Sequence, residues 1–237
     1  MFKYIIITPF KKVVESYIND SILLKAQSKN VVKFYIYDLF EFSNSSNHRI
    51  DDYAFGGGPG MVLKPEPIFR CFDKVEKDLG VDRRAITVIF PTPDGKVLNQ
   101  KISKNLSENK ILVFICGKYK GIDQRVRDQL VDHEISIGDY VITGGDLSTL
   151  VIMDSMIRLI PGVLNNIESA NSDSFSSNLL DSPKYTRPER FRSLDVPKVL
   201  LSGNHKKIDD WNRLEKEKKT KLNRPDLWDK YTKNVME

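Results

Sequence analysis

The feature that most constrains the fold is an alternation, over the first 165 residues, of short β-branched runs with longer amphipathic segments. The runs have the length of strands, and the amphipathic segments have the apolar spacing of helices. The predicted strands are Lys3–Thr8, Val31–Tyr37, Ala85–Phe90, Lys110–Cys116 and Asp139–Thr143. The predicted helices are Phe10–Gln27, Glu66–Leu79, Asn99–Leu106 and Asp123–Val131. Strands that alternate with helices are typical of a parallel sheet covered by helices, so we predict an α/β domain over residues 1–165.

The segment LSTLVIMDSMIRLIPGVL predicts one further helix, which has Ser148 as its N-cap and ends at Pro161-Gly162. It is apolar nearly all round, so we expect it to be buried on most sides, with a second subunit as one packing partner. Its only charged residues, Asp154 and Arg158, are four positions apart and therefore lie on one face.

The last third of the chain changes in composition. Residues 169–182 contain six serines, which indicates a linker over residues 166–183. Helical patterns follow, so we predict a small helical domain over residues 184–237. Residues 182–237 hold 15 Lys and Arg against 9 Asp and Glu, whereas the rest of the chain is nearly neutral. This surplus fits a polyanion such as nucleic acid, and a solvated helical surface is the alternative.

Bulk composition excludes several classes of protein. The chain is 40% hydrophobic and 29% charged, which is ordinary for a soluble globular protein. No apolar run approaches the roughly 18 residues of a membrane span, and the first residues lack a signal-peptide pattern. The two cysteines, Cys71 and Cys116, have no metal-ligand spacing and suit a reducing compartment, so we expect a cytoplasmic protein.

Nine of the thirteen glycines fall in two short regions, GGGPG at residues 56–60 and the stretch from Gly117 to Gly145. Neither a P-loop motif nor a strand followed by GxGxxG is present. The loops FPTPDG, CGKYKG and SIGDYVITGG instead follow or flank three predicted strands. Loops at the carboxyl ends of a parallel sheet commonly form a ligand crevice, and bare backbone suits a flat aromatic ligand. Tight turns without a ligand are the alternative.

Seven motifs, in this order, carry a resemblance to a known family: DDYAFGGGPGMVL, CGKYKGIDQRV, EISIGDYVITGGDL, RLIPGVL, DSF…LLDSPKYTRP, VPKVLLSGNH and RPDLW. The chain resembles the bacterial tRNA (guanine-N1)-methyltransferases of the TrmD type. The resemblance implies a SPOUT fold, in which a parallel sheet carries a deep trefoil knot, and a homodimer with active sites at the subunit interface. It also implies methyl transfer from S-adenosylmethionine to N1 of guanosine 37 in tRNA.

By the same resemblance, S-adenosylmethionine lies in the glycine loops. The implied cofactor-binding residues are Phe90, Gly117, Tyr119, Ile137, Gly138, Asp139, Tyr140, Val141, Ile142, Gly144 and Gly145. Lys120 stands where the family usually has glutamate, which is a departure in this region. The family also suggests a magnesium requirement, although no metal-ligand spacing in this sequence supports it.

Methylation of guanine N1 requires a base for its proton and a positive group near O6. The resemblance assigns these roles to Asp173 and Arg158, and it places Pro59, Gly60 and Asp181 at the substrate. From the residues alone, Arg158 can instead pair with Asp154. Asp173 can equally be a solvated linker carboxylate. We expect the serine-rich linker to fold over the base when tRNA binds.

Two other functions remain open at the level of the sequence. One is a related knotted methyltransferase that acts on another RNA base or on ribose, for which a carboxylate at Asp173 is not needed. The other is a non-catalytic RNA-binding protein with a degenerate pocket, which Lys120 keeps open. Binding of S-adenosylmethionine separates both methyltransferases from the non-catalytic alternative.

Overall fold

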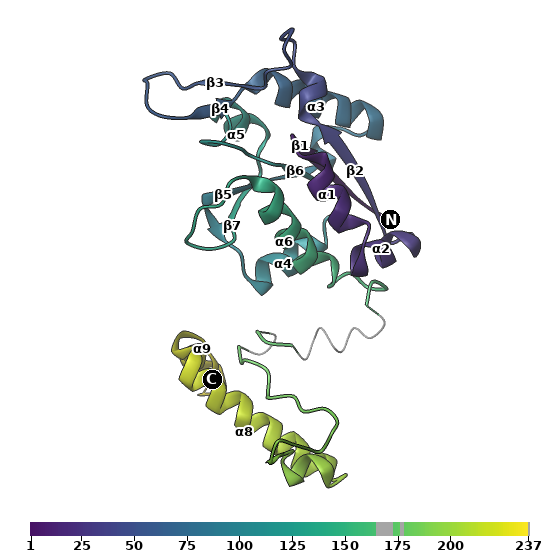
Figure 1. Cartoon of the computed structure of the whole chain (residues 1–237), viewed down its shortest axis with the longest axis vertical. Coiled ribbons are helices and arrows are strands. Elements are labelled where there is room, and N and C mark those ends of the chain that lie inside the picture. The colour runs from purple at the N-terminus through teal and green to yellow at the C-terminus, as the bar shows by residue number, and fades with distance from the viewer. Residues whose placement is uncertain (165–172, 176–177, 237) are drawn as a thin grey trace. The chain divides into compact units, whose positions relative to one another are not determined.

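The computed structural model describes residues 1–164, 173–175 and 178–236 (Figure 1). The chain divides into two compact units, Met1–Ile167 and Glu168–Glu237. Residues 166–172, 176 and 177 of the predicted linker lie outside the described residues. Within the described ranges, no helix is both long and apolar enough to cross a membrane.

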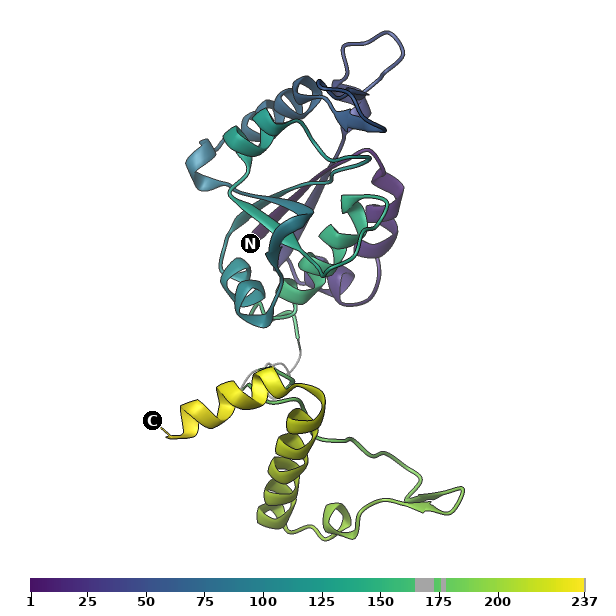
Figure 2. The same cartoon turned by 90° about the vertical axis from the view of Figure 1, so that its left-hand side faces the viewer.

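A five-stranded sheet forms the centre of the first unit (Figure 2). In spatial order the strands are β2 (Val32–Asp38), β1 (Phe2–Thr8), β6 (Ile111–Ile115), β5 (Thr87–Val97) and β7 (His133–Ser136). Every neighbouring pair is parallel. The predicted α/β class with a parallel sheet is therefore confirmed, and four of the five predicted strands are present at their predicted places.

Strand β1 explains why the sheet needs cover on both faces. Its side chains alternate between two separate clusters: Tyr4 and Ile6 belong to one, and Ile5 and Ile7 belong to the other. All four are fully buried. Because successive side chains of a strand point to opposite faces, an unbroken apolar run requires helices on each side.

Two groups of helices supply that cover. Helices α1 (Lys11–Ile18), α2 (Ser21–Ser28), α4 (Gln100–Ser107) and α6 (Gly145–Ile157) contribute to the cluster that contains Ile6. Helices α3 (Pro65–Leu79) and α5 (Gln124–Leu130) contribute to the cluster that contains Ile5. Single residues also fix several helix starts: Asn99 caps α4 and Asp123 caps α5 through side-chain oxygens that accept backbone N–H groups.

The prediction of one helix over Phe10–Gln27 is wrong, because the chain breaks between α1 and α2. The Asp20 side chain accepts the backbone N–H of Ser21 at 2.6 Å, and Ser21 has a positive φ of 51°. A short acidic side chain that bonds a neighbouring backbone amide favours a helix start over a helix interior. The apolar periodicity continues across the break and therefore did not reveal it.

The predicted strand Asp139–Thr143 is also wrong. The strand of this region is β7, which ends at Ser136, and residues 137–143 form a loop. Gly138 adopts a φ of +143°, a conformation that suits glycine and turns the chain away from the sheet. Tyr140 and Val141 are then 55% and 84% exposed, so the apolar run is not part of the core.

The N-cap of helix α6 lies four residues earlier than predicted. Gly144, in extended backbone, takes the N-cap position, and Ser148 lies in the first turn, where its hydroxyl donates to the Gly145 carbonyl at 3.0 Å. Arg158 is the C-cap residue. The early start matters because it brings Gly144 and Gly145 onto the end of β6.

A two-stranded hairpin, β3 (Asp51–Tyr53) and β4 (Met61–Leu63), carries the GGGPG segment between its strands. The hairpin joins the loop that follows β6. The Leu63 N–H donates to the Gly121 carbonyl at 3.0 Å, and the Lys120 N–H donates to the Met61 carbonyl at 2.9 Å. Two distant parts of the sequence thus meet beside the carboxyl end of β6.

The second unit contains helices α8 (His205–Asn223) and α9 (Pro225–Met236), a short 3-10 turn at Lys198–Leu201, and a small hairpin of β8 (Arg190–Phe191) and β9 (Leu194–Asp195). Asn204 caps α8 by accepting the Lys207 N–H at 3.1 Å. Tyr231 of α9 donates to Glu217 of α8 at 3.1 Å. Both tryptophans of the chain, Trp211 and Trp228, belong to this unit.

Candidate functional site: a glycine-lined pocket and a lysine-bound loop

A pocket of about 410 Å³ opens at the carboxyl ends of three neighbouring strands. Its wall is built from four stretches and two single residues, which are Phe90–Asp94, Gly117–Gly121, Ile135–Gly138, Tyr140–Gly145, Arg127 and Ser148. The first stretch leaves the sheet ladder, because Pro91 and Lys96 of β5 both pair with Ile135 of β7. Ligand crevices of parallel α/β proteins lie at this end of the sheet.

In the pocket wall, the backbones of Gly145 and Gly117 lie in close contact. The Gly145 N–H donates to the Gly117 carbonyl at 2.7 Å. A Cβ on Gly145 would lie 2.7 Å from the Gly117 nitrogen and 3.1 Å from the Cys116 Cα. Any larger residue would therefore push the start of α6 off the end of β6. Glycine is required here by space, since the backbone of Gly145 is itself ordinary.

The Phe90 ring forms a wall of the pocket against Gly117. A Cβ on Gly117 would lie 2.8 Å from Cε2 of Phe90, so this glycine lets the ring approach the loop closely. The Arg127 guanidinium lies 5.5 Å from the ring centroid. Phe90 is only 2% exposed. The pocket thus contains an aromatic wall that is held by contacts with Gly117 and Arg127.

Arg127 is itself held by two acids. Its Nε donates to Glu134 at 2.7 Å, and its terminal nitrogen contacts Asp94 at 2.7 Å. The Glu134 and Asp94 partners raise the pKa of Arg127, and hydrogen bonds from Thr92 and then Arg127 lower the pKa of Asp94. Arg127 and Asp94 therefore stay charged at neutral pH. The cluster joins α5, β5 and β7 under one side of the pocket.

Beneath the glycine turn lies a buried carboxyl group, that of Asp146, which is 6% exposed. It accepts a short hydrogen bond from the Thr8 hydroxyl at the end of β1. Burial raises the pKa of Asp146, and the bond from Thr8 opposes that rise. Cys116 shares this environment, and its Sγ lies 3.3 Å from Oγ1 of Thr149. The network fixes the first turn of α6 to the ends of β1 and β6.

Loop 137–143 closes the remaining side. Ser136 and Gly138 bond each other, with the Ser136 hydroxyl 3.0 Å from the Gly138 carbonyl. The Tyr140 N–H donates to the same carbonyl at 2.9 Å. Tyr140, Val141 and Ile142 line the pocket while remaining exposed, and Asp139 does not line it. These apolar residues form a rim rather than a core strand.

The substrate residues implied by the resemblance begin at the rim of this pocket. A Cβ on Gly60 would lie 2.9 Å from Cγ of Lys120, so Gly60 contacts the side chain of a pocket residue. Pro59 and Gly60 are both exposed. Tyr119 is 54% exposed with a positive φ of 59°. The hairpin that carries GGGPG thus extends the pocket toward solvent.

Arg158 lies at the end of α6 and is partly buried. Its predicted alternative partner, Asp154, accepts a hydrogen bond from the Tyr17 hydroxyl at 3.3 Å. Arg158 belongs to the first unit and Asp173 to the second. Neither unit therefore contains both the acid and the cation that the resemblance implies.

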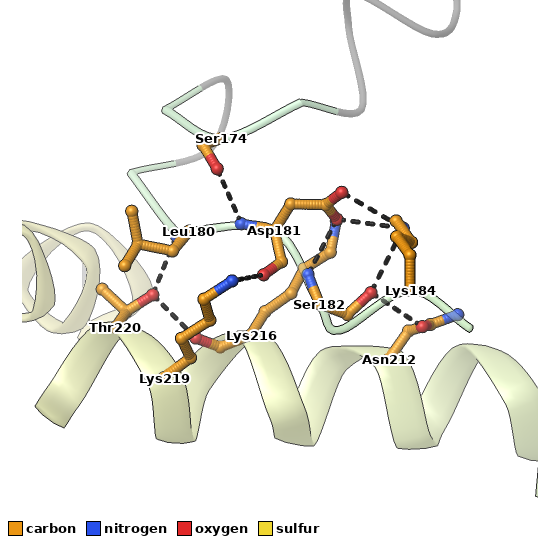
Figure 3. Close-up of polar contacts among 9 residues, drawn as sticks. All are labelled: Ser174, Leu180, Asp181, Ser182, Lys184, Asn212, Lys216, Lys219 and Thr220. Atoms are coloured by element: carbon orange, nitrogen blue, oxygen red, sulfur yellow. Dashed lines mark hydrogen bonds and ion pairs between the residues drawn. The ribbon is translucent and has the colours of Figure 1, made fainter. Parts of the chain in front are cut away.

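Asp181 lies in a cluster of lysines on the second unit (Figure 3). Its carboxylate contacts Lys184 at 3.1 Å and Lys216 at 3.3 Å, and its carbonyl accepts from Lys219 at 3.1 Å. Burial of Asp181 favours the neutral acid, but hydrogen bonds from Lys184, the Ser182 amide and Lys216 outweigh it and lower the pKa. Asp181 is consequently an anchored anion.

Sequence reasoning missed part of the pocket wall. Among the missed residues are Arg127, Asp94, Lys118 and Ser148. The i, i+4 spacing of Gly144 and Ser148 could have indicated one of them, because both belong to the first turn of one helix. Nothing local in the sequence connects Arg127 with Asp94, since they are 33 positions apart. Over the described residues, no three His, Cys, Asp or Glu side chains form a metal ligand set, so we assign no step to magnesium.

The fold and the pocket define an α/β ligand-binding protein whose site is built by the loops at the carboxyl ends of parallel strands. The chain belongs to the family tRNA (Guanine-1)-methyltransferase TrmD, whose model matches residues 2–230. It is 46% identical to the tRNA (guanine-N(1)-)-methyltransferase of Clostridioides difficile (strain 630), over 96% of this chain and 98% of that protein. It is 49% identical to the enzyme of the same name from Sulfurihydrogenibium sp. (strain YO3AOP1), over 96% of this chain and 88% of that protein.

We expect Gly145→Ala to destabilise the first unit by about 1–3 kcal/mol, the usual cost of forcing an extra carbon into a packed contact. The methyl group would meet the backbone of Gly117 and Cys116, which cannot move aside as a side chain can. Hydrogen exchange should rise in β6 and the first turn of α6 while β2, at the far edge of the sheet, stays unchanged. Unaltered exchange at β6 would contradict the close contact.

We expect Asp181→Asn to lower the unfolding free energy of the second unit by about 1 kcal/mol at neutral pH, because its ion pairs with Lys184 and Lys216 are lost. The folded pKa of Asp181 lies below the unfolded value of about 3.9. Its contribution is therefore present above that value and disappears as the pH falls through the folded pKa. Urea unfolding followed by tryptophan fluorescence reports this unit alone.

Asp195→Asn is the matched control for Asp181→Asn. Asp195 pairs with Arg190 at 3.6 Å, but both side chains are 71% exposed. An exposed pair contributes little, so this variant should unfold like the wild type at every pH. Equal losses in the two variants would show that Asp181 has no special place in the lysine cluster.

Proposed function

We propose that this protein transfers the methyl group of S-adenosylmethionine to N1 of guanosine 37 in tRNA. The observation that carries the proposal is the glycine-lined pocket at the carboxyl ends of β5, β6 and β7, in a chain of the TrmD family. A tRNA substrate places the reaction in the cytoplasm. The relatives named above are tRNA (guanine-N(1)-)-methyltransferases, and this chain matches 98% and 88% of their lengths.

The donor occupies the pocket beside Phe90 in this proposal. Gly117, Gly138, Gly144 and Gly145 carry no side chains, which would hold an adenine ring at a distance from the backbone. The flat Phe90 ring and the apolar rim of Tyr140–Ile142 offer contacts that suit an aromatic ligand. The volume of about 410 Å³ is in the range of small-molecule sites.

The proposal includes the trefoil knot of the SPOUT fold. Its support is the path of the chain on either side of β7. After that edge strand, residues 137–144 return across the sheet, and Gly144 forms an antiparallel bridge with Lys118 after β6. Helix α6 then continues on the face of the sheet that also contains Ile6. A chain that returns over an earlier loop and proceeds beyond it has the route that a knot needs.

The chemistry assigned to the chain is proton removal and charge stabilisation. Asp173 accepts the N1 proton as N1 bonds the methyl carbon, and the carbon–sulfur bond of the donor breaks. The products are 1-methylguanosine, S-adenosylhomocysteine and a protonated Asp173. Arg158 stabilises the negative charge that grows on O6. Since the two residues come from different units, the site is complete only when a second unit meets the pocket.

A homodimer supplies that arrangement, and an apolar face of the first unit supports it. Val13 and Tyr17 of α1 are 40% and 44% exposed, and Leu147 and Val151 of α6 are 55% and 47% exposed. Each pair is four residues apart and so lies on one face of its helix. Tyr17 bonds Asp154 of α6, which places these two helices side by side. An exposed apolar surface of this kind suits a subunit interface.

In this proposal the basic second unit binds the tRNA. Its lysines and arginines meet backbone phosphates, so affinity should fall as the salt concentration rises. Guanosine 37 leaves the stack of the anticodon loop to reach the pocket, as bases do in enzymes that modify them. Pro59 and Gly60 border the guanine, and Asp181 lies at the neighbouring nucleotide.

One experiment tests the function as a whole. Transcripts that differ only at position 37 are incubated with the protein and S-adenosylmethionine, and the methylated atom is mapped by nuclease digestion and mass spectrometry. Methyl on N1 of guanosine 37 supports the proposal. Methyl on ribose or on another base indicates the related knotted methyltransferase, and binding of RNA without binding of the donor indicates a non-catalytic protein.

We expect Asp173→Asn to reduce single-turnover methylation by about 100-fold or more, the scale of a general base, because an amide cannot take the N1 proton. Binding of tRNA should stay within a few-fold of the wild type, since the side chain keeps its size. Asp195→Asn, an exposed carboxylate of the same unit, is the control and should methylate normally. Near-normal turnover of Asp173→Asn would remove this residue from the mechanism.

A further inference from the structure

The segment that follows Asp173 is fastened to helix α8 by a set of specific polar contacts (Figure 3). We propose that α8 positions the proposed base: Thr220 and Asn212 hold residues 180–182, and through them Ser174 beside Asp173, in the geometry that methyl transfer needs. They act through Asp173, so they are positioning residues and do not touch the substrate. The inference rests on the proposed function and assigns to α8 a role beyond binding RNA phosphates.

The loop is first closed on itself. The Asp181 N–H donates to the Ser174 hydroxyl at 2.9 Å, across seven positions of the chain. The Phe175 N–H donates to the Leu179 carbonyl at 2.9 Å, and Leu179 is only 6% exposed. Ser174 is the residue next to Asp173, so whatever fixes Asp181 also restricts the backbone that carries the proposed base.

The closed loop is then fastened to α8 at two points. The Leu180 N–H donates to the Thr220 hydroxyl at 2.8 Å, and the Ser182 hydroxyl donates to the Asn212 side chain at 2.8 Å. Thr220 is fully buried and Ser182 is 3% exposed. The Thr220 hydroxyl donates in turn to the Lys216 carbonyl at 2.7 Å. Both fastenings are therefore shielded from water, which makes them costly to break.

Helical geometry explains how three residues of α8 contact the same loop. Asn212, Lys216 and Thr220 are four positions apart and lie on one stripe of the helix. The middle residue, Lys216, contacts the Asp181 carboxylate at 3.3 Å. The stripe thus offers an amide, an ammonium and a hydroxyl in a row to residues 180–182. Figure 3 shows these side chains pointing from the helix to the loop.

An ordered loop contributes to rate rather than to affinity. Fixing the backbone of one residue costs on the order of 1–2 kcal/mol in entropy. If the fold already orders this backbone, the proton acceptor is in place before the reaction. The entropy cost of ordering it is then not part of the activation barrier. Loss of an anchor should therefore slow methylation while tRNA, which meets many other groups of the unit, binds nearly as before.

The alternative is that the stripe exists only to bind RNA phosphates. Substitution of Lys216 or Lys219 cannot distinguish the two roles, because a lysine can bind either a phosphate or the loop. Substitution of Thr220 can distinguish them, since Thr220 is uncharged and 0% exposed. Its removal leaves the positive charge of the unit unchanged, so any loss of rate must act through the loop.

The test compares Thr220→Val with Thr220→Ser in the full-length protein. Valine keeps the shape and removes the hydroxyl, and serine keeps the hydroxyl. We expect single-turnover methylation at saturating tRNA to fall about tenfold for valine, the factor for a buried hydrogen bond, and to stay near normal for serine. The tRNA dissociation constant should change by less than about twofold in both. Tryptophan fluorescence verifies that the second unit is folded.

Thr232→Val is the matched control. The Thr232 hydroxyl donates to the Trp228 carbonyl of its own helix at 3.1 Å and holds no loop. If Thr220→Val unfolds the unit, Ser182→Ala removes the other fastening from the loop side and should give the same slow methylation. Equal rates for Thr220→Val and Thr232→Val in folded protein would overturn the inference.

A double-mutant cycle separates this inference from the proposed function. If Thr220 acts through Asp173, Thr220→Val should cause no further loss in a protein that already carries Asp173→Asn. A full tenfold loss in that background would show that Thr220 acts elsewhere. If Asp173→Asn alone methylates normally, the proposed base fails and the inference fails with it. If Asp173→Asn is slow and Thr220→Val is fast, only the inference fails.

Discussion

The contact on which the rest of the site depends is the approach of two backbones at Gly145 and Gly117. It allows α6 to start directly against the end of β6, with the Gly145 amide bonded to the Gly117 carbonyl at 2.7 Å. The buried Asp146 carboxyl then reaches Thr8 at the end of β1. Loop 137–143 has to span the distance from β7 to this point, and so it becomes the rim of the pocket. One glycine pair thereby determines the route of three segments.

The two units contribute different kinds of order. In the first unit, apolar burial on both faces of the sheet fixes the strand ends, and these ends in turn position the loops that line the pocket. In the second unit, polar contacts between α8 and residues 180–182 supply comparable order. The two units therefore owe their local order to different interactions, apolar burial in the first and polar contacts in the second.

Lys120 and the Arg127 cluster give this chain its own electrostatic character. Lys120 stands where the family usually has glutamate, and its stem contacts Gly60 of the hairpin. Arg127 remains paired with Glu134 and Asp94, so its charge is compensated within the wall. Lys120 thus adds a positive group to a wall in which two acids face one arginine.

The sequence by itself determined the parallel α/β sheet, the helical second unit and the glycine clusters, because apolar periodicity and glycine placement are local signals. Motif order determined the family. Only the tertiary structure decided that Tyr140–Ile142 form an exposed rim and that Thr220 holds Leu180. The first depends on the turn at Gly138, which apolarity cannot reveal. The second joins residues 40 positions apart, and such pairing leaves no trace in local sequence.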